Sequence, residues 1–204
     1  MSRSVTLAAA LTACIGFHAA AGIYNKTLSI GDGAPDWKNL EGTDGKKHSL
    51  ADFADKDVLV ICFTCNTCPY AVDYEDRLIA LAEKFAAEGN RCAVVAINAN
   101  KVKDDLLPAM QERAKTKGFN FPYLHDATQQ VARSYGATFT PEFVVLNKDR
   151  KVIYLGAMDD SSDGKNITKR YLEDAVAAAV AGKAPTTTET AAVGCAVRYV
   201  KERK

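Results

Sequence analysis

Three evenly spaced cysteines are the residues of this sequence that are best suited to chemistry. Cys62, Cys65 and Cys68 follow one another at intervals of three in the stretch VLVICFTCNTCPYAVDYEDRL, and they are half of the chain's six cysteines. Such an array could bind a metal or an iron–sulfur cluster, attach a haem, or cycle between dithiol and disulfide. It could also combine one redox pair with a third cysteine that takes no part in the chemistry.

The residues around the array argue against the haem and metal alternatives. Haem attachment needs a histidine directly after the second cysteine of a C-x-x-C motif, and this chain has Pro69 there. The ferredoxin pattern requires a fourth cysteine after Cys68, and structural zinc sites use four ligands, usually in two pairs. Beyond residue 21 the chain has only His48 and His125, and no second C-x-x-C. A redox disulfide between Cys65 and Cys68 is therefore the favoured interpretation.

The elements around the motif would place its thiols at the start of a helix. The apolar, β-branched run Val58–Phe63 predicts a strand that is buried on both faces. A helix follows at once, with Pro69 in its first turn and Gly89 at its end. A thiol at this junction faces unpaired N–H groups and the positive helix dipole, which favour the thiolate. We expect Cys65, nearer the open end, to attack, and Cys68 to resolve the mixed disulfide.

Strands and helices alternate along the rest of the chain. The order β-α-β-α-β-α-β-β-α, after a loop with a short strand around Trp37–Leu40, predicts an α/β fold with parallel strands and a final antiparallel hairpin. The further strands are CAVVAIN, FPYLHD, EFVVLN and KVIYLG, and the further helices are Pro108–Lys117, ATQQVARSYG and Ile167–Ala181. The segment KAPTTTETAAVG that follows predicts a linker or irregular tail leading to Cys195.

Composition limits the classes of protein that the chain can belong to. Its 204 residues, 48% of them hydrophobic, suit one domain with its own core. The net charge of +1, from 26 basic and 25 acidic residues, argues against a nucleic-acid partner. No apolar run approaches the ~18 residues that a membrane span needs.

The first 21 residues have the pattern of a secretory signal peptide. A short basic start, an apolar run and three small residues precede Gly22. The sequence LTAC also resembles a lipobox, which would make Cys14 a lipidated N-terminus; we take simple export, to the periplasm or the exterior, as the main prediction. Disulfides persist in such compartments. The predicted division is a signal peptide at 1–21, a globular domain at 22–184 and a tail at 185–204 that carries Cys195.

Three stretches together resemble a known family. They are CNTCPYAVDYEDRLIALAEKF, FPYLHDATQQVARSYGATFTPEFVVLNKDRKVIYLG and AVGCAVRY. Over residues 28–199 the chain resembles the thioredoxin-fold redoxins, in particular the peroxiredoxin-like branch related to the alkyl hydroperoxide reductase/thiol-specific antioxidant proteins. The resemblance implies a thioredoxin-like α/β fold, whose central mixed sheet is flanked by helices. It also implies an N-terminal extension and an inserted helical segment at residues 99–125.

The same resemblance implies a substrate groove beside the cysteine pair. Pro141, in FTPEF, corresponds to the cis-proline of the thioredoxin fold, and Thr140 would flank the pair through its backbone. X-Pro bonds adopt the cis form at little cost, which suits such a turn. Thr64 and Pro69, which border the motif, are expected in the same groove. The ordinary alternative for Pro141 is a trans proline that begins an edge strand.

A comparison with true peroxiredoxins shows where this chain departs from them. In that alignment Cys68 takes the place of the peroxidatic cysteine, and Cys65 takes the place of a threonine. The arginine that polarises the peroxide is missing from TPEFVV, which has Glu142 instead. Relatives often carry histidine where this motif has Thr67. No proton acceptor for the resolving thiol is evident, apart from Glu142 as a candidate.

The other cysteines have separate interpretations. Cys62 and Cys92 lie in predicted buried strands and are expected to be small hydrophobic core residues. Cys195 belongs to the GC pair that is part of the resemblance. Two interpretations of it stay open: an extra redox thiol, brought back to the Cys65–Cys68 pair by the tail, or a thiol without redox function in a docked tail.

The sequence therefore predicts an exported thiol–disulfide oxidoreductase that cycles Cys65 and Cys68. The expected partners are protein disulfides or dithiols and a thiol protein that donates electrons, and no cofactor or metal is expected. One alternative is a thiol peroxidase that uses Cys68 on hydroperoxides. Another is a Cu(I)-handling protein, in which the pair and Met158 act as soft ligands.

Overall fold

A computed structural model describes residues 22–87, 89 and 91–201 of the chain. The predicted signal peptide, with Cys14, lies outside these residues. Among the helices of the described part, none combines the length and apolar character needed to cross a membrane.

Seven strands form a central mixed sheet in the order β2-β1-β5-β4-β3-β7-β8. They are β1 (Leu40–Gly42), β2 (Lys47–His48), β3 (Val58–Phe63), β4 (Cys92–Asn98), β5 (Tyr123–His125), β7 (Glu142–Leu146) and β8 (Val152–Gly156). The central strand β3 pairs with β4 in parallel and with β7 antiparallel. β7 and β8 form the predicted antiparallel hairpin. The sheet is the mixed one expected, and β3 and β4 have their predicted bounds.

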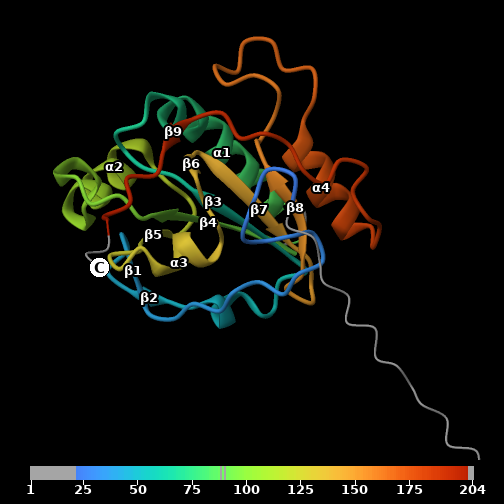
Figure 1. Cartoon of the computed structure of the whole chain (residues 1–204), viewed down its shortest axis with the longest axis horizontal. Helices are drawn as coiled ribbons and strands as arrows, with labels where there is room; N and C mark the ends of the chain where they lie inside the picture. Colours follow the sequence, from blue (N-terminus) through green and yellow to red (C-terminus); the bar gives the residue numbers. More distant parts are fainter. Residues whose placement is uncertain (1–21, 88, 90, 202–204) are drawn as a thin grey trace, which may run out of the picture.

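Helices cover both faces of this sheet (Figure 1). They are α1 (Pro69–Ala87), α2 (Leu107–Lys117), α3 (Gln130–Ser134) and α4 (Tyr171–Val180), with 3-10 turns η1 (Leu50–Phe53) and η2 (Lys103–Asp105). α1, α2 and α4 pack against one face, and α3 packs against the other. α1 begins at the predicted proline, and α2 ends at Lys117 and is capped by Gly118 in the left-handed conformation.

The last helix begins later than its sequence pattern predicts. We expected a helix from Ile167, but α4 starts at Tyr171. The carboxylate of Asp160 accepts hydrogen bonds from the backbone N–H groups of Thr168 and Lys169, at 2.9 and 3.0 Å. These bonds hold the segment in a loop, because a side chain that binds backbone N–H groups competes with the helical hydrogen bonds.

The strand expected around Trp37–Leu40 is also shifted. Asn39 has a φ of 57°, a left-handed conformation that an extended strand cannot contain. β1 therefore starts only at Leu40. Trp37 is buried and packs in the core instead of pairing in the sheet.

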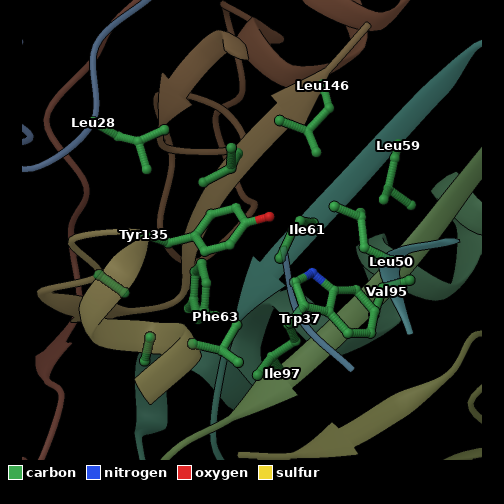
Figure 2. Packing of buried hydrophobic residues seen from close by; sticks show 14 of the residues in the cluster. Leu28, Trp37, Leu50, Leu59, Ile61, Phe63, Val95, Ile97, Tyr135 and Leu146 are labelled. Atoms are coloured by element: carbon green, nitrogen blue, oxygen red, sulfur yellow. The ribbon is translucent and has the colours of Figure 1, made fainter. Parts of the chain in front are cut away.

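The side chains of β3 alternate between two hydrophobic clusters. Its odd-numbered residues from Leu59 to Phe63 pack with Trp37 and Tyr135 in one cluster, which Figure 2 shows. Its even-numbered residues, including Cys62, pack beneath α1 and α4 in the other. β3 is thus covered on both faces, as its apolar run predicts. This rigid strand leads directly into the C-x-x-C motif.

The C-terminal tail is irregular over residues 183–194, as predicted, apart from one isolated bridge at Glu189, and it is docked on the domain. β9 (Cys195–Ala196) pairs antiparallel with β6 (Phe139–Thr140) in a second, two-stranded sheet. Closer to α4, the N–H of Thr190 donates to the carbonyl of Leu155 at 3.0 Å. In Figure 1 the tail, drawn in red, runs from α4 to β9, beside β6 and the start of α1.

Buried amide side chains hold the tail beyond β9. The N–H of Arg198 donates to Oδ1 of Asn100 at 2.8 Å, and Nε2 of Gln129 donates to the carbonyl of Arg198 at 3.0 Å. Val200 donates its N–H to Oε1 of the same Gln129 at 2.8 Å. These contacts satisfy backbone groups that have no strand partner.

Candidate active site

The C-x-x-C loop lies between the end of β3 and the start of α1. The N–H of Thr64 donates to the carbonyl of Ile97 at 2.9 Å, which extends the β3–β4 pairing to the edge of the motif. Both sulfur-bearing residues are buried: Cys65 is 3% exposed and Cys68 is 2% exposed. The described cysteines form no disulfide with one another.

Cys68, rather than Cys65, occupies the N-terminus of the helix. α1 starts at Pro69, so Cys68 is the residue before the first helical position, and its carbonyl accepts the N–H of Val72 at 3.0 Å. Proline suits the first helical position because its missing N–H would be unpaired there. Each sulfur meets one backbone N–H at the start of the helix: Cys65 meets that of Cys68, and Cys68 meets that of Ala71.

Thr140 contacts both cysteines from the opposite side. The Thr140–Pro141 peptide bond is cis, the form that the family resemblance implies. The hydroxyl of Thr140 lies 3.4 Å from Sγ of Cys65, and its carbonyl accepts a hydrogen bond from the Cys68 thiol at 3.0 Å. One residue thus fixes the positions of both sulfurs.

The other residues expected in the groove do not form one open surface. Thr64 and Pro141 line a cavity of about 10 Å³ beneath α1, together with Cys62 and Ala71. A cavity of this size has room for about one water at most. Pro69 is exposed at the start of the helix. This cavity therefore gives no room for a small-molecule substrate behind the cysteines.

Hydrogen bonds favour the thiolate form of Cys68. Burial by itself would raise the pKa of Cys68, but donors outweigh it: the Cys195 thiol, the N–H of Ala71 and the N–H of Cys195, which lies 3.4 Å from Sγ. The carbonyl of Thr140 is the contact that favours the protonated thiol. The net result is a pKa below the ordinary value, since donors to a sulfur stabilise its anion.

The surroundings of Cys65 act in the opposite direction. Burial raises the pKa of Cys65, and the negative charge of Asp105 raises it further, while the hydroxyl of Thr140 and the N–H of Cys68 only partly offset them. Desolvation and a nearby like charge both disfavour an anion. In the reduced protein, the thiolate is therefore favoured on Cys68 and the neutral thiol on Cys65.

Asp105 is a residue of the site that the sequence analysis missed. Its side chain is fully buried and accepts hydrogen bonds from the N–H groups of Asn66 and Thr67, at 2.8 and 3.1 Å. The hydroxyl of Thr67 donates to it at 2.8 Å, and Nδ2 of Asn100 at 3.0 Å. Asp105 thus supplies the buried carboxylate next to the motif. It comes from η2 in the inserted segment, and no local pattern linked it to the cysteines.

Cys195 lies at the same site. It is partly buried, and it packs against the small cluster formed by Cys65, Cys68 and Ala71. Burial and its contact with the Cys68 sulfur raise the pKa of the Cys195 thiol to about 11. It is therefore a neutral hydrogen-bond donor in the reduced protein, and the structure brings all three of these thiols together.

Glu142, the carboxylate that the sequence offered as proton acceptor, has a different role. It is buried, which raises its pKa, and its carboxylate accepts the N–H groups of Thr138 and Phe139 at 2.8 and 3.0 Å. It therefore holds the turn before the cis peptide bond. Its hydrogen bonds go to that turn, and Asp105 is the carboxylate beside Cys65.

The remaining candidates lie away from the paired cysteines. Met158 and Cys62 pack in the core beneath α1 and α4, so Met158 is not available as a copper ligand at the pair. Cys92 is buried at the start of β4. Among the described residues, no group of three or more His, Cys, Asp or Glu side chains has the spacing of a metal site.

The fold and the site together define a class. A central mixed sheet, a C-x-x-C motif at the start of α1 and a cis-proline facing it are the features of a thioredoxin-like protein. Within this class the chain belongs to the Redoxin family, whose model matches residues 29–174.

The chain is also similar to individual proteins of known sequence or structure. The thiol-disulfide oxidoreductase ResA of Bacillus cereus is 26% identical over 147 residues, which are 70% of this chain and 79% of ResA. A hypothetical protein from Sinorhizobium meliloti has 34% identity and a TM-score of 0.80, over 87% of this chain and 98% of its own. An uncharacterized conserved protein from Geobacillus kaustophilus has 30% identity and a TM-score of 0.81, over 89% of this chain and 97% of its own.

Proposed function

We propose that this chain is an exported thiol–disulfide oxidoreductase that cycles Cys65 and Cys68 between dithiol and disulfide. The observation that carries the proposal is the contact of Thr140, the residue before the cis-proline, with both sulfurs. The name of the Bacillus cereus relative, a thiol-disulfide oxidoreductase, supports it. In the reducing direction, two electrons pass to a substrate disulfide, which becomes a dithiol, and the pair becomes a disulfide.

The pKa order suggests which sulfur begins the reaction. A thiolate is the form that attacks a disulfide, and Cys68 has the lowered pKa. We propose that Cys68 forms the mixed disulfide with the substrate and that Cys65 then attacks Cys68, which releases the reduced substrate. This order is the reverse of the one that the motif alone suggested. The tail must move away from Cys68 first, because Cys68 is buried.

Exposed apolar side chains around the site favour polypeptide substrates. Among the described residues, seven large hydrophobic side chains are exposed. Four of them are close in sequence to residues that contact the pair or its loop: Tyr70 follows the motif, Leu106 follows Asp105, Phe139 precedes Thr140, and Val193 precedes the Gly-Cys pair. Exposed apolar groups at a site favour binding of protein chains. The partners that we propose are therefore proteins with a disulfide or dithiol, and a thiol protein that returns electrons.

Redox titration tests the cycle. The purified protein is equilibrated with mixtures of oxidised and reduced glutathione, and the Cys65–Cys68 disulfide is quantified by mass after alkylation. Insulin reduction with dithiothreitol as electron source gives the activity. We expect activity to disappear in Cys65→Ser and Cys68→Ser and to persist in Cys92→Ala, a matched control that removes a thiol elsewhere. A wild-type protein that never forms this disulfide would contradict the proposal.

Export is tested by the N-terminus of the mature protein. The proposal rests on the pattern of residues 1–21. We expect mass spectrometry of the protein from its native host to show a chain that begins at Gly22. A lipid-modified Cys14 would support membrane anchoring instead, and an uncleaved chain in the cytoplasm would refute export.

The lowered pKa of Cys68 also supports a second candidate, a thiol peroxidase. Its thiolate would attack a hydroperoxide, release the alcohol or water, and form a sulfenic acid that condenses with Cys65. Against this function, Cys65 stands where peroxiredoxins have threonine, and the position expected to supply arginine is Glu142. Consumption of hydrogen peroxide by the reduced protein, lost in Cys68→Ser, would favour the peroxidase.

A further inference from the structure

The tail occupies the strand edge that lies beside the cysteine pair. Cys195 is the register partner of Thr140 in the pairing of β9 with β6, and the N–H of Val197 donates to the carbonyl of Thr138 at 2.9 Å. The backbone that precedes the cis-proline is therefore already paired within the chain. An incoming polypeptide that paired with β6 would have to displace β9, because a strand edge binds one partner at a time.

A glycine allows this close approach. A Cβ added to Gly194 would overlap the carbonyl oxygen of Thr140, the same atom that contacts the Cys68 thiol. Residue 194 therefore has to lack a side chain for β9 to reach this position. The requirement concerns Gly194 alone, so the position of the tail can be altered without changing Cys195.

The side chain of Cys195 lies in contact with the cysteine pair. The amide of Cys195 lies 3.4 Å from Sγ of Cys68, and the Cys195 side chain packs against the pair. Rotation about the Cα–Cβ bond moves a cysteine sulfur around its own amide, so the Cys195 sulfur has access to Cys68 from this backbone position. Asn100 adds a second link, because it binds both Asp105 beneath the motif and Arg198 in the tail.

We infer that Cys195 is a third redox thiol, which exchanges with the Cys65–Cys68 disulfide to form a Cys68–Cys195 disulfide that ties the tail over the site. This inference rests on the proposed cycling of Cys65 and Cys68 and concerns the regulation of the same site. The tail then acts as an internal competitor of polypeptide substrates, and the new disulfide keeps it in place.

The exchange balances without any further reagent. The Cys195 thiolate attacks Sγ of Cys68, the Cys68–Cys195 bond forms, and the Cys65–Cys68 bond breaks. Cys65 leaves with the electron pair as a thiolate and takes up the proton that Cys195 has lost, so no net oxidation occurs. In the oxidised protein Cys68 carries no negative charge, and the interaction with it that opposes ionisation of Cys195 is then absent.

Peptide mapping tests the exchange. Trypsin would release residues 57–77, which hold all three motif cysteines, and residues 184–198, which hold Cys195. In a Cys62→Ala, Cys65→Ser protein, the first peptide has Cys68 as its only cysteine. After equilibration with glutathione disulfide and alkylation, we expect these two peptides to be joined. The wild-type protein, mapped in the same way, should contain a fraction in which residues 57–77 are joined to residues 184–198, and the variant identifies Cys68 as the partner.

A second variant separates the position of the tail from its thiol. Gly194→Val keeps Cys195 but displaces β9. We expect the linked species to form at least about tenfold more slowly than in the wild type, because the effective concentration of the Cys195 thiol near Cys68 falls. Cys195→Ser should give no joined peptides. A link at the wild-type rate in Gly194→Val would show that docking of β9 is not its cause and would overturn the inference.

The outcomes also separate this inference from the proposed function. If the Cys65–Cys68 disulfide forms in Cys195→Ser but neither the wild type nor the Cys65→Ser protein shows a link to Cys195, only the inference fails. If Cys195 is joined to Cys65 and never to Cys68, it fails as well. If no Cys65–Cys68 disulfide forms in any variant that retains both cysteines, the proposed function fails.

Discussion

Residues 98–106, from the inserted segment, and residues 188–200, from the C-terminal tail, both border the C-x-x-C loop. The inserted segment presents a carboxylate, that of Asp105, to the N–H groups of Asn66 and Thr67. The tail presents donors, the N–H and thiol of Cys195, to the sulfur of Cys68. One segment therefore places negative charge near the pair, and the other supplies hydrogen-bond donors to it.

This difference explains why two cysteines of one short motif have different acidities. The charge of Asp105 adds to burial in raising the pKa of Cys65, whereas the donors around Cys68 outweigh burial and lower its pKa. The start of the helix donates one backbone N–H to each sulfur, that of Cys68 to Cys65 and that of Ala71 to Cys68, so the difference comes from the inserted segment and the tail. The acidity of a thiol thus follows from the segments packed against it more than from its order in the motif.

The largest effect is expected from removing the acceptor of the inserted segment. Asp105→Ala leaves the N–H groups of Asn66 and Thr67 and the amide of Asn100 without their partner, and we expect the free energy of unfolding to fall by about 3 kcal/mol. Asp105→Asn, the matched control, keeps the shape and should cost less. Denaturant unfolding measures both. An unchanged midpoint in Asp105→Ala would show that this network does not hold the loop.

The next effect concerns the docking of the tail. In Gly194→Val the new side chain meets the carbonyl of Thr140, and the overlap would cost about 1–3 kcal/mol if the tail stayed in place. We expect β9 to detach instead and the pKa of Cys68 to rise, because its donors leave. Hydrogen exchange of the amides of residues 195–197 checks the detachment, and protected amides in the variant would contradict it.

Proteins that keep only one cysteine of the C-x-x-C pair test the order of acidity directly. We expect iodoacetamide to alkylate Cys68 at lower pH in Cys65→Ser than it alkylates Cys65 in Cys68→Ser, since only the thiolate reacts. Both proteins should be measured with the tail opened by Gly194→Val as well as closed, because both sulfurs are buried. In the proteins opened by Gly194→Val, the difference between the pKa of Cys68 and that of Cys65 should become smaller. A lower pKa for Cys65 in both forms would reverse our assignment of the attacking sulfur.

The smallest effect is a change in how stability depends on pH. The folded-state pKa of Cys68 lies below 9.0, so this group stabilises the fold above pH 9, and the contribution is lost as the pH falls through the folded pKa. The raised pKa of Cys195 contributes below pH 9 and is lost as the pH rises through about 11. In Cys195→Ala, the free energy of unfolding should depend less on pH in both ranges, and the difference from the wild type should stay below about 1 kcal/mol. An identical pH profile for both proteins would show that the two thiols do not interact.

Much of the scaffold could be predicted from the sequence, since its signals are local. The apolar runs gave β3 and β4 their bounds, and Pro69 marked the start of α1. The family resemblance placed Pro141 opposite the motif, where the structure has a cis peptide bond. The start of α4 was wrong because the side chain of Asp160, outside the helical pattern, holds the preceding residues in a loop.

The site itself depends on contacts between distant parts of the chain. Asp105 binds the N–H of Asn66 across 39 positions of sequence, and Cys195 reaches Cys68 across 127. No local periodicity or motif predicts the contact of Asp105, and the resemblance offered the contact of Cys195 only as one of two interpretations, because both depend on how distant segments pack against the sheet.

The sequence by itself determined which atoms can react: two thiols at the spacing of one helical turn, after a strand and before a helix. The tertiary structure alone decided how they differ. Desolvation, the charge of Asp105 and the donors of the tail act through space over a few ångströms, and they raise the pKa of Cys65 and lower that of Cys68. The same packing brought Cys195 to the pair, which the sequence could offer only as one of two interpretations.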